Sequence, residues 1–84
     1  MSTVIDDIHA KQNIAANVRL LLRERDWSQA RLARETGETT MMISHICKAD
    51  HVANAATLAR IAEVLRTSVD WLLADHTTES HVTA

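Results

Sequence analysis

The sequence predicts an all-α domain built from five short helices, and three observations carry that prediction. The 84 residues are 46% apolar and rich in Ala, Leu, Ile and Val, with one glycine and neither proline, phenylalanine nor tyrosine. Apolar residues recur at spacings of three and four, which is typical of amphipathic helices. Ser, Thr or Asn precedes most of these periodic segments, at the position where such residues cap a helix.

The first helix is expected from about Lys11 to Arg25. Its apolar stripe consists of Ile14, Val18, Leu21 and Leu22. The preceding stretch, MSTVIDDIHA, has weak periodicity, so residues 1–10 are interpreted as an N-terminal arm, with room for one helical turn.

Two short helices with a tight connection follow. Ser28 is a plausible N-cap for a helix over about 29–36, and Gly37 follows where a left-handed residue ends a helix. Thr39 caps a further helix over about 40–48. At 100° per residue, Ile43, Ile46 and Cys47 gather on one face of that helix, whereas Met41, His45 and Lys48 fall on the opposite face.

Two more helices complete the prediction. Asn54 caps a helix from about 55 to 66, and Ser68 caps a short one containing VDWLLAD. Residues 76–84 form a polar tail or linker stub, in which His76 and His81 are expected to be solvated. One domain over residues 11–75 is therefore predicted between the arm and the tail.

Composition and charge narrow the classes of function. The net charge is −2, but all nine Lys and Arg lie between Lys11 and Arg66, with six acidic residues, so this middle part carries +3. That distribution permits nucleic-acid binding without requiring it. The small core and the lack of a nucleophile–base pair argue against an enzyme and against a bound cofactor. One cysteine, no apolar run of membrane length and no cationic leader favour a cytoplasmic protein without a membrane partner.

The spacing of the second and third helices is that of a helix-turn-helix, in which the second of the pair enters a DNA major groove. Over about residues 13–74 the sequence resembles the Cro and lambdoid-repressor family. The resemblance rests on Ser28-Gln29, Leu32-Ala33, Gly37, Ile43, Ile46, LARIAEVL and SVDWLLA. It implies a compact five-helix lambda repressor-like domain that binds double-stranded DNA, in a bacterium or in a phage acting in a bacterial host.

The resemblance also implies which residues contact DNA. Gln29 matches a residue that contacts phosphate and braces the recognition helix, Thr40 and Met41 open that helix toward the groove, and His45 follows one turn later. Thr39, Ser44 and Lys48 lie beside them, with Lys48 suited to a phosphate. Met41 lacks a hydrogen-bond donor, so it can read a base only by apolar contact, most naturally with a thymine methyl.

Two departures from the family pattern stand out. An arginine–glutamate pair between the first and third helices is replaced by Leu22 and Cys47, which we interpret as a packed apolar contact. The glycine usual after the third helix is Ala49, which leaves the exit geometry open.

Partners remain open at this point. Val69, Trp71 and Leu72 give the last helix more apolar surface than it usually buries, and in lambdoid proteins this region contributes to homodimers. Trp71 is equally compatible with closing the core over the first helix. The first hypothesis is a homodimeric, operator-binding repressor or Cro-like regulator. The alternative, motivated by the acidic ends, is an antitoxin that neutralises a toxin through its acidic tail or its last helix, with DNA binding secondary. A metal site at His45, Cys47 and His51 is disfavoured, because His45 and Cys47 point in opposite directions.

Overall fold

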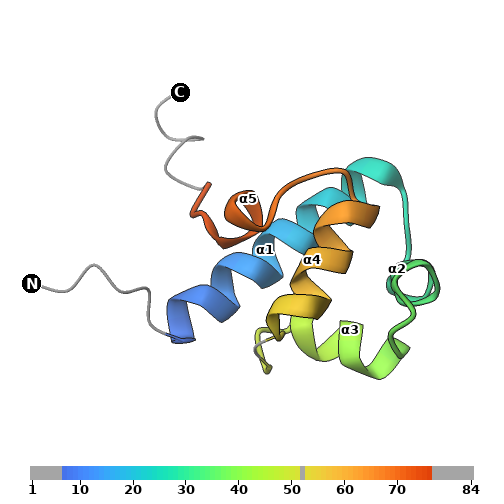
Figure 1. Ribbon diagram of the computed structural model, residues 1–84, viewed down its shortest axis with the longest axis horizontal. Helices are drawn as coiled ribbons and strands as arrows, with labels where there is room; N and C mark the ends of the chain where they lie inside the picture. The colour runs from blue at the N-terminus through green and yellow to red at the C-terminus, as the bar shows by residue number, and fades with distance from the viewer. Residues whose placement is uncertain (1–6, 52, 77–84) are drawn as a thin grey trace, which may run out of the picture.

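The computed structural model describes residues 7–51 and 53–76, and within them every regular element is a helix. The helices are α1 (Asp7–Arg25), α2 (Gln29–Thr36), α3 (Thr40–Cys47), α4 (Ala55–Val64) and α5 (Val69–Leu73). Helix α1 runs through the middle of the fold; in the view of Figure 1, α5 lies above it, α3 below it and α2 beyond its C-terminal end. The predicted all-α, five-helix architecture is confirmed.

The helices meet in one hydrophobic core. α1 packs against α3 and α5, α2 against α3 and α4, and α4 against α5. The most completely buried large side chains come from all five helices and the residue that ends α4: Val18, Leu32, Ile43, Ile46, Ile61, Leu65 and Leu72. Leu22 and Cys47 both belong to this core, as their interpretation as an apolar pair required. Because the core lies between the helices, the outer face of each remains for binding.

The predicted caps are confirmed at four helix starts. A side-chain oxygen accepts the backbone N–H three residues later at Ser28, Thr39, Asn54 and Ser68. The donor–acceptor distances lie between 2.8 and 3.0 Å. Each cap satisfies one of the N–H groups that a helix start leaves without a partner.

Three helix ends differ from the predictions by two residues or more. α1 begins at Asp7 rather than Lys11, so residues 7–10 are helical instead of part of an arm; residues 1–6 lie outside the described part. α4 ends at Val64, because Arg66 adopts a left-handed φ of 61°. α5 ends at Leu73, because Ala74 is extended. Local periodicity could not reveal these ends, since each depends on backbone conformation rather than on the apolar stripe.

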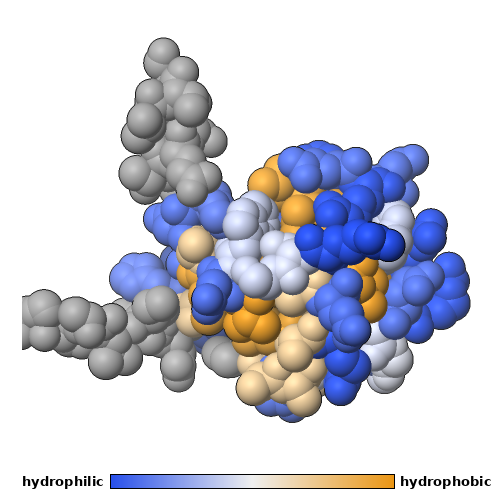
Figure 2. Space-filling view, turned by 45° about the horizontal axis from the view of Figure 1, so that its top comes forward, coloured by the Kyte–Doolittle hydropathy of each residue, from blue (hydrophilic) through white to orange (hydrophobic). Residues whose placement is uncertain are grey.

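Hydrophobic residues also reach the surface on the side of α5. Figure 2 turns that side toward the viewer and shows hydrophobic residues in the middle of the face, bordered by hydrophilic ones. On α5 itself, Val69, Trp71 and Leu73 are partly buried and pack against the core.

Candidate nucleic-acid interface

The connection between α2 and α3 has the geometry that the lone glycine predicts. Gly37 takes φ 77° and ψ 12°, and its N–H donates to the carbonyl of Ala33. The next amide, of Glu38, donates to the same carbonyl at 3.0 Å. Glycine adopts this left-handed conformation without the steric cost that a Cβ brings. The chain therefore reverses within three residues and starts α3 at a fixed angle to α2.

Glu38 ties this turn to α4. Its side chain is 16% exposed, and its Oε2 accepts hydrogen bonds from Thr57 Oγ1 at 3.1 Å and from the Arg60 guanidinium. These bonds, that from Arg60 foremost, hold the pKa of Glu38 below its ordinary value of 4.5. Sequence reasoning counted Glu38 only as an acid, since nothing local places it beside residues 19 and 22 positions later.

α3 has two distinct faces. Ile43, Ile46 and Cys47 are buried, whereas Met41 and His45 are exposed, as the 100° spacing predicts. Met41 is 71% exposed, the only large hydrophobic side chain in the described part of the chain that is so open. An eight-residue helix is about 12 Å long, comparable to the width of a B-DNA major groove. The outer face of α3 can therefore lie in that groove.

The other predicted contact residues surround this face. Thr39 and Thr40 are exposed at the start of α3, and Thr39 also caps the helix. Ser44 is half-buried, and Lys48 is exposed at the C-cap. Gln29, the first residue of α2, is half-buried. These residues are thus placed at both ends of α3 and at the start of α2.

His45 has a neighbour that the sequence did not suggest. Its Nδ1 lies 3.7 Å from Asp50 Oδ2, and both side chains are about half exposed. The backbone N–H of Asp50 also donates to the carbonyl of His45 at 3.0 Å. The carboxylate is therefore held on the Nδ1 side of the ring, and Nε2 is the ring nitrogen away from it.

The arginines of α2 differ from each other. The Arg31 guanidinium stacks over the Trp27 ring, 4.2 Å from its centroid, and its Nε lies 3.7 Å from Glu35. Arg31 is exposed, and its stacking on Trp27 is a contact between residues four positions apart. Arg34 is exposed, so it remains available to a phosphate.

The C-terminal end of the domain lies against α1 through Asn17. This asparagine is only 4% exposed, and its Nδ2 donates to the carbonyls of Trp71, Leu72 and Ala74 at 2.8 to 3.2 Å. His76 stacks on Trp71 with ring centroids 4.0 Å apart and lies 2.9 Å from its carbonyl oxygen through Nε2. The expectation of a solvated His76 is therefore wrong, because the end of α5 turns it back onto the indole; His81 lies outside the described residues.

The predicted dimer contacts separate into two groups. Leu72 is 0% exposed within its own protomer, so its side chain offers no surface to a partner. The prediction that Leu72 contacts a dimer partner is therefore corrected, because its position on α5 directs its side chain into the core. Val69 and Trp71 are partly exposed.

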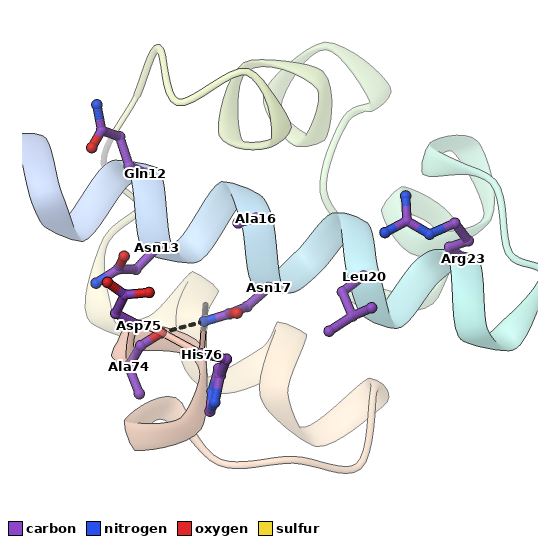
Figure 3. A pocket seen from close by; sticks show the side chains of 9 residues that line it. All are labelled: Gln12, Asn13, Ala16, Asn17, Leu20, Arg23, Ala74, Asp75 and His76. Atoms are coloured by element: carbon purple, nitrogen blue, oxygen red, sulfur yellow. Dashed lines mark hydrogen bonds between the residues drawn. The ribbon is translucent and has the colours of Figure 1, made fainter. Parts of the chain in front are cut away.

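A groove of about 510 Å³ runs along α1 beside the residues that follow α5 (Figure 3). It is lined by Gln12, Asn13, Ala16, Asn17, Leu20, Arg23, Ala74, Asp75 and His76. None of these belongs to α2 or α3, so the groove is separate from the predicted DNA-binding face.

Two other kinds of site, a metal-binding cluster and a membrane-spanning helix, are absent from the described part of the chain. Within residues 7–51 and 53–76, no group of three or more His, Cys, Asp or Glu side chains is arranged to hold a metal ion. No helix in that part of the chain has the length and apolar character needed to cross a bilayer.

The chain is similar to a known protein family and to a solved structure. A family model described as helix-turn-helix matches residues 18–72. A crystal structure of a hypothetical transcription factor, NHTF, from Neisseria is 21% identical to this chain. The two superpose with a TM-score of 0.80 over 98% of this chain and 94% of that one, which shows a common fold. No curated protein sequence matches the chain significantly.

Proposed function

Because the chain belongs to the Cro/C1-type helix-turn-helix family of DNA-binding regulators, we propose that it is a homodimeric repressor or Cro-like protein of the phage or prophage type. Each protomer places α3 in the major groove of one half of a palindromic operator. A two-fold dimer then reads half-sites whose centres lie about 34 Å apart.

The observation that carries this proposal is the exposed Met41 at the start of α3. Its neighbours Ile43 and Ile46 are fully packed, so the fold holds the helix in place while leaving this apolar side chain in water. Contact with a thymine methyl removes that exposure. His45, one turn later, offers a ring N–H to guanine N7 or O6.

Contacts to the DNA backbone lie on both sides of these two base contacts. Thr39, Thr40 and Ser44 supply hydroxyls, Gln29 an amide, and Lys48 a cation. Phosphate contacts of this kind fix the register of the helix, and the base contacts supply specificity. The set of base-reading groups is small, so DNA shape contributes part of the discrimination.

Dimerisation is assigned to α5. Val69 and Trp71 remain partly exposed on that helix. Two-fold symmetry would bring the same patch of each protomer together.

The test is selection of the purified protein on a randomised duplex library, followed by replacement of each enriched thymine with uracil. Loss of one methyl from the Met41 contact is expected to weaken binding about fourfold, from roughly 0.8 kcal/mol per buried methyl-sized group. Met41→Ala should bind both duplexes equally, whereas His45→Ala should keep the thymine preference and lose discrimination at another position. Absence of any enriched inverted repeat would refute the proposal.

The antitoxin alternative predicts a different outcome. A small basic protein would then co-purify with the chain and be required for tight operator binding. A homodimer that binds its operator alone counts against this alternative.

A further inference from the structure

The end of α3 is fully supplied with hydrogen-bond donors. The last four carbonyls of a helix lack partners inside it, and each must be satisfied from elsewhere. Three accept backbone N–H groups of the following residues: Ser44 from Lys48 at 3.1 Å, Ile46 from Ala49 at 3.1 Å and His45 from Asp50 at 3.0 Å. The fourth carbonyl, that of Cys47, accepts a hydrogen bond from a distant side chain.

That side chain is Arg19 of α1, whose Nη1 donates to the Cys47 carbonyl oxygen across 28 positions of sequence. The guanidinium brings positive charge to the C-terminal end of the helix, where the macrodipole is negative. Nothing in the local sequence places Arg19 beside the Cys47 carbonyl. Val18 is completely buried beside it, so α1 presents Arg19 from a fixed position.

The contact leaves most of the guanidinium unused. A guanidinium carries five N–H donors, and the bond to Cys47 occupies one of them. Arg19 is exposed, and across the described segments no carboxylate lies within ion-pair distance of it. Lys48, also exposed, follows Cys47 directly. Two cations therefore border the same end of α3.

We propose that Arg19 is a DNA-backbone contact, donating to a phosphate while it holds the Cys47 carbonyl. This inference rests on the proposed docking of α3. When the start of a recognition helix reaches base edges, its C-terminal end lies near the sugar–phosphate backbone. A planar fork of donors can serve the carbonyl and a phosphate together. Arg19 thus links the position of α3 in the groove to a phosphate of the duplex.

A role limited to capping α3 makes a different prediction from a role in binding phosphate. A phosphate contact releases counterions, so the slope of log K against log salt is negative. Removing one contact makes that slope shallower by about 0.9, whereas loss of a cap leaves it unchanged. The salt dependence of operator binding therefore separates the two roles.

The experiment compares Arg19→Gln, Arg19→Lys and Arg66→Gln with the unmodified chain on the selected operator. Gln carries no charge and is two bonds too short to replace Nη1, so it removes both the charge and the cap; Lys keeps the charge on a single ammonium group. Arg66 is the matched control, because it is exposed in the α4–α5 connection, on the opposite side of the domain from α3 (Figure 1). Thermal unfolding of each variant verifies that it is folded.

We expect Arg19→Gln to make the negative slope shallower by about 0.9. Binding should weaken about eightfold at 0.1 M salt, which is the contribution of one released counterion. Arg19→Lys should retain the slope, and Arg66→Gln should match the unmodified chain. An unchanged slope for Arg19→Gln, or an equal change for Arg66→Gln, would overturn the inference. If the unmodified chain selects no operator, it is the proposed function itself that fails.

Discussion

The two left-handed residues that flank α3 predict stability changes of opposite sign. Gly37 has φ 77° before the helix, and Ala49 has φ 63° after it, where the family pattern has glycine. An L-residue with a Cβ pays about 1–2 kcal/mol in this region. Glycine avoids that cost but loses about 0.5–1 kcal/mol more conformational entropy on folding. Ala49→Gly should therefore stabilise the domain, and Gly37→Ala should destabilise it.

The magnitude at each site follows from the difference of these two terms, about 0.5–1 kcal/mol. At Gly37 nothing lies within 4 Å of an added Cβ, so the effect of Gly37→Ala is purely one of backbone conformation. Ala49 is half-buried, and loss of its methyl contact places Ala49→Gly at the lower end of the range. For a domain of this size, such changes shift Tm by about 2–8 °C.

The assay is urea and thermal unfolding of both single variants and of the double variant. The two positions are separated by the length of α3, about 12 Å, so the two effects should add and the double variant should lie close to the unmodified chain. Destabilisation by Ala49→Gly would refute the reasoning. It would mean that the Ala49 side chain contributes more through packing than its backbone conformation costs.

Two further predictions concern contacts that anchor α3 and α5. Because hydrogen bonds lower the pKa of Glu38, its contribution to stability is complete above the ordinary value of 4.5 and is lost as pH falls through the folded-state pKa. Glu38→Gln should therefore lower the free energy of unfolding at neutral pH and converge with the unmodified chain in acid; a pH-independent difference would contradict this. Asn17→Ala should destabilise the domain by about 2 kcal/mol in urea unfolding, since it removes the donor to three carbonyls. Asn13→Ala, which removes one bond to Leu73, serves as the comparison, and an equal loss for both would argue against that reading.

Patterns among residues close together in the sequence were sufficient to predict most of the fold. Caps at Ser28 and Thr39 and the left-handed Gly37 depend only on residues within one turn of each other, which is why the sequence predicts them. The faces of α3 follow from helical geometry alone, so the exposure of Met41 and the burial of Ile43 were also predictable.

Hydrogen bonds between groups far apart in the sequence were not predictable. Arg19, Asn17 and Glu38 each bond to a group 19 to 57 positions away in the sequence. Propensity and periodicity describe which face a residue occupies, but not which carbonyl or hydroxyl of another helix comes opposite it. The partly exposed Trp71 is a similar case, since its contact with His76 depends on how the chain leaves α5.

These long-range contacts explain how so short a helix can be ordered well enough to act as a recognition helix. Eight residues are too few for a stable isolated helix, so the order of α3 must come from tertiary contacts. Ile43 and Ile46 anchor its inner face, Glu38 fastens the preceding turn to α4, and Arg19 holds its last carbonyl from α1. In the proposed complex Met41 reads a thymine methyl, and that contact is made only at van der Waals distance. Discrimination between operator and other DNA therefore depends on the fixed position of α3, and weakening any of these three anchors should reduce discrimination more than it reduces non-specific binding, which needs only the cations.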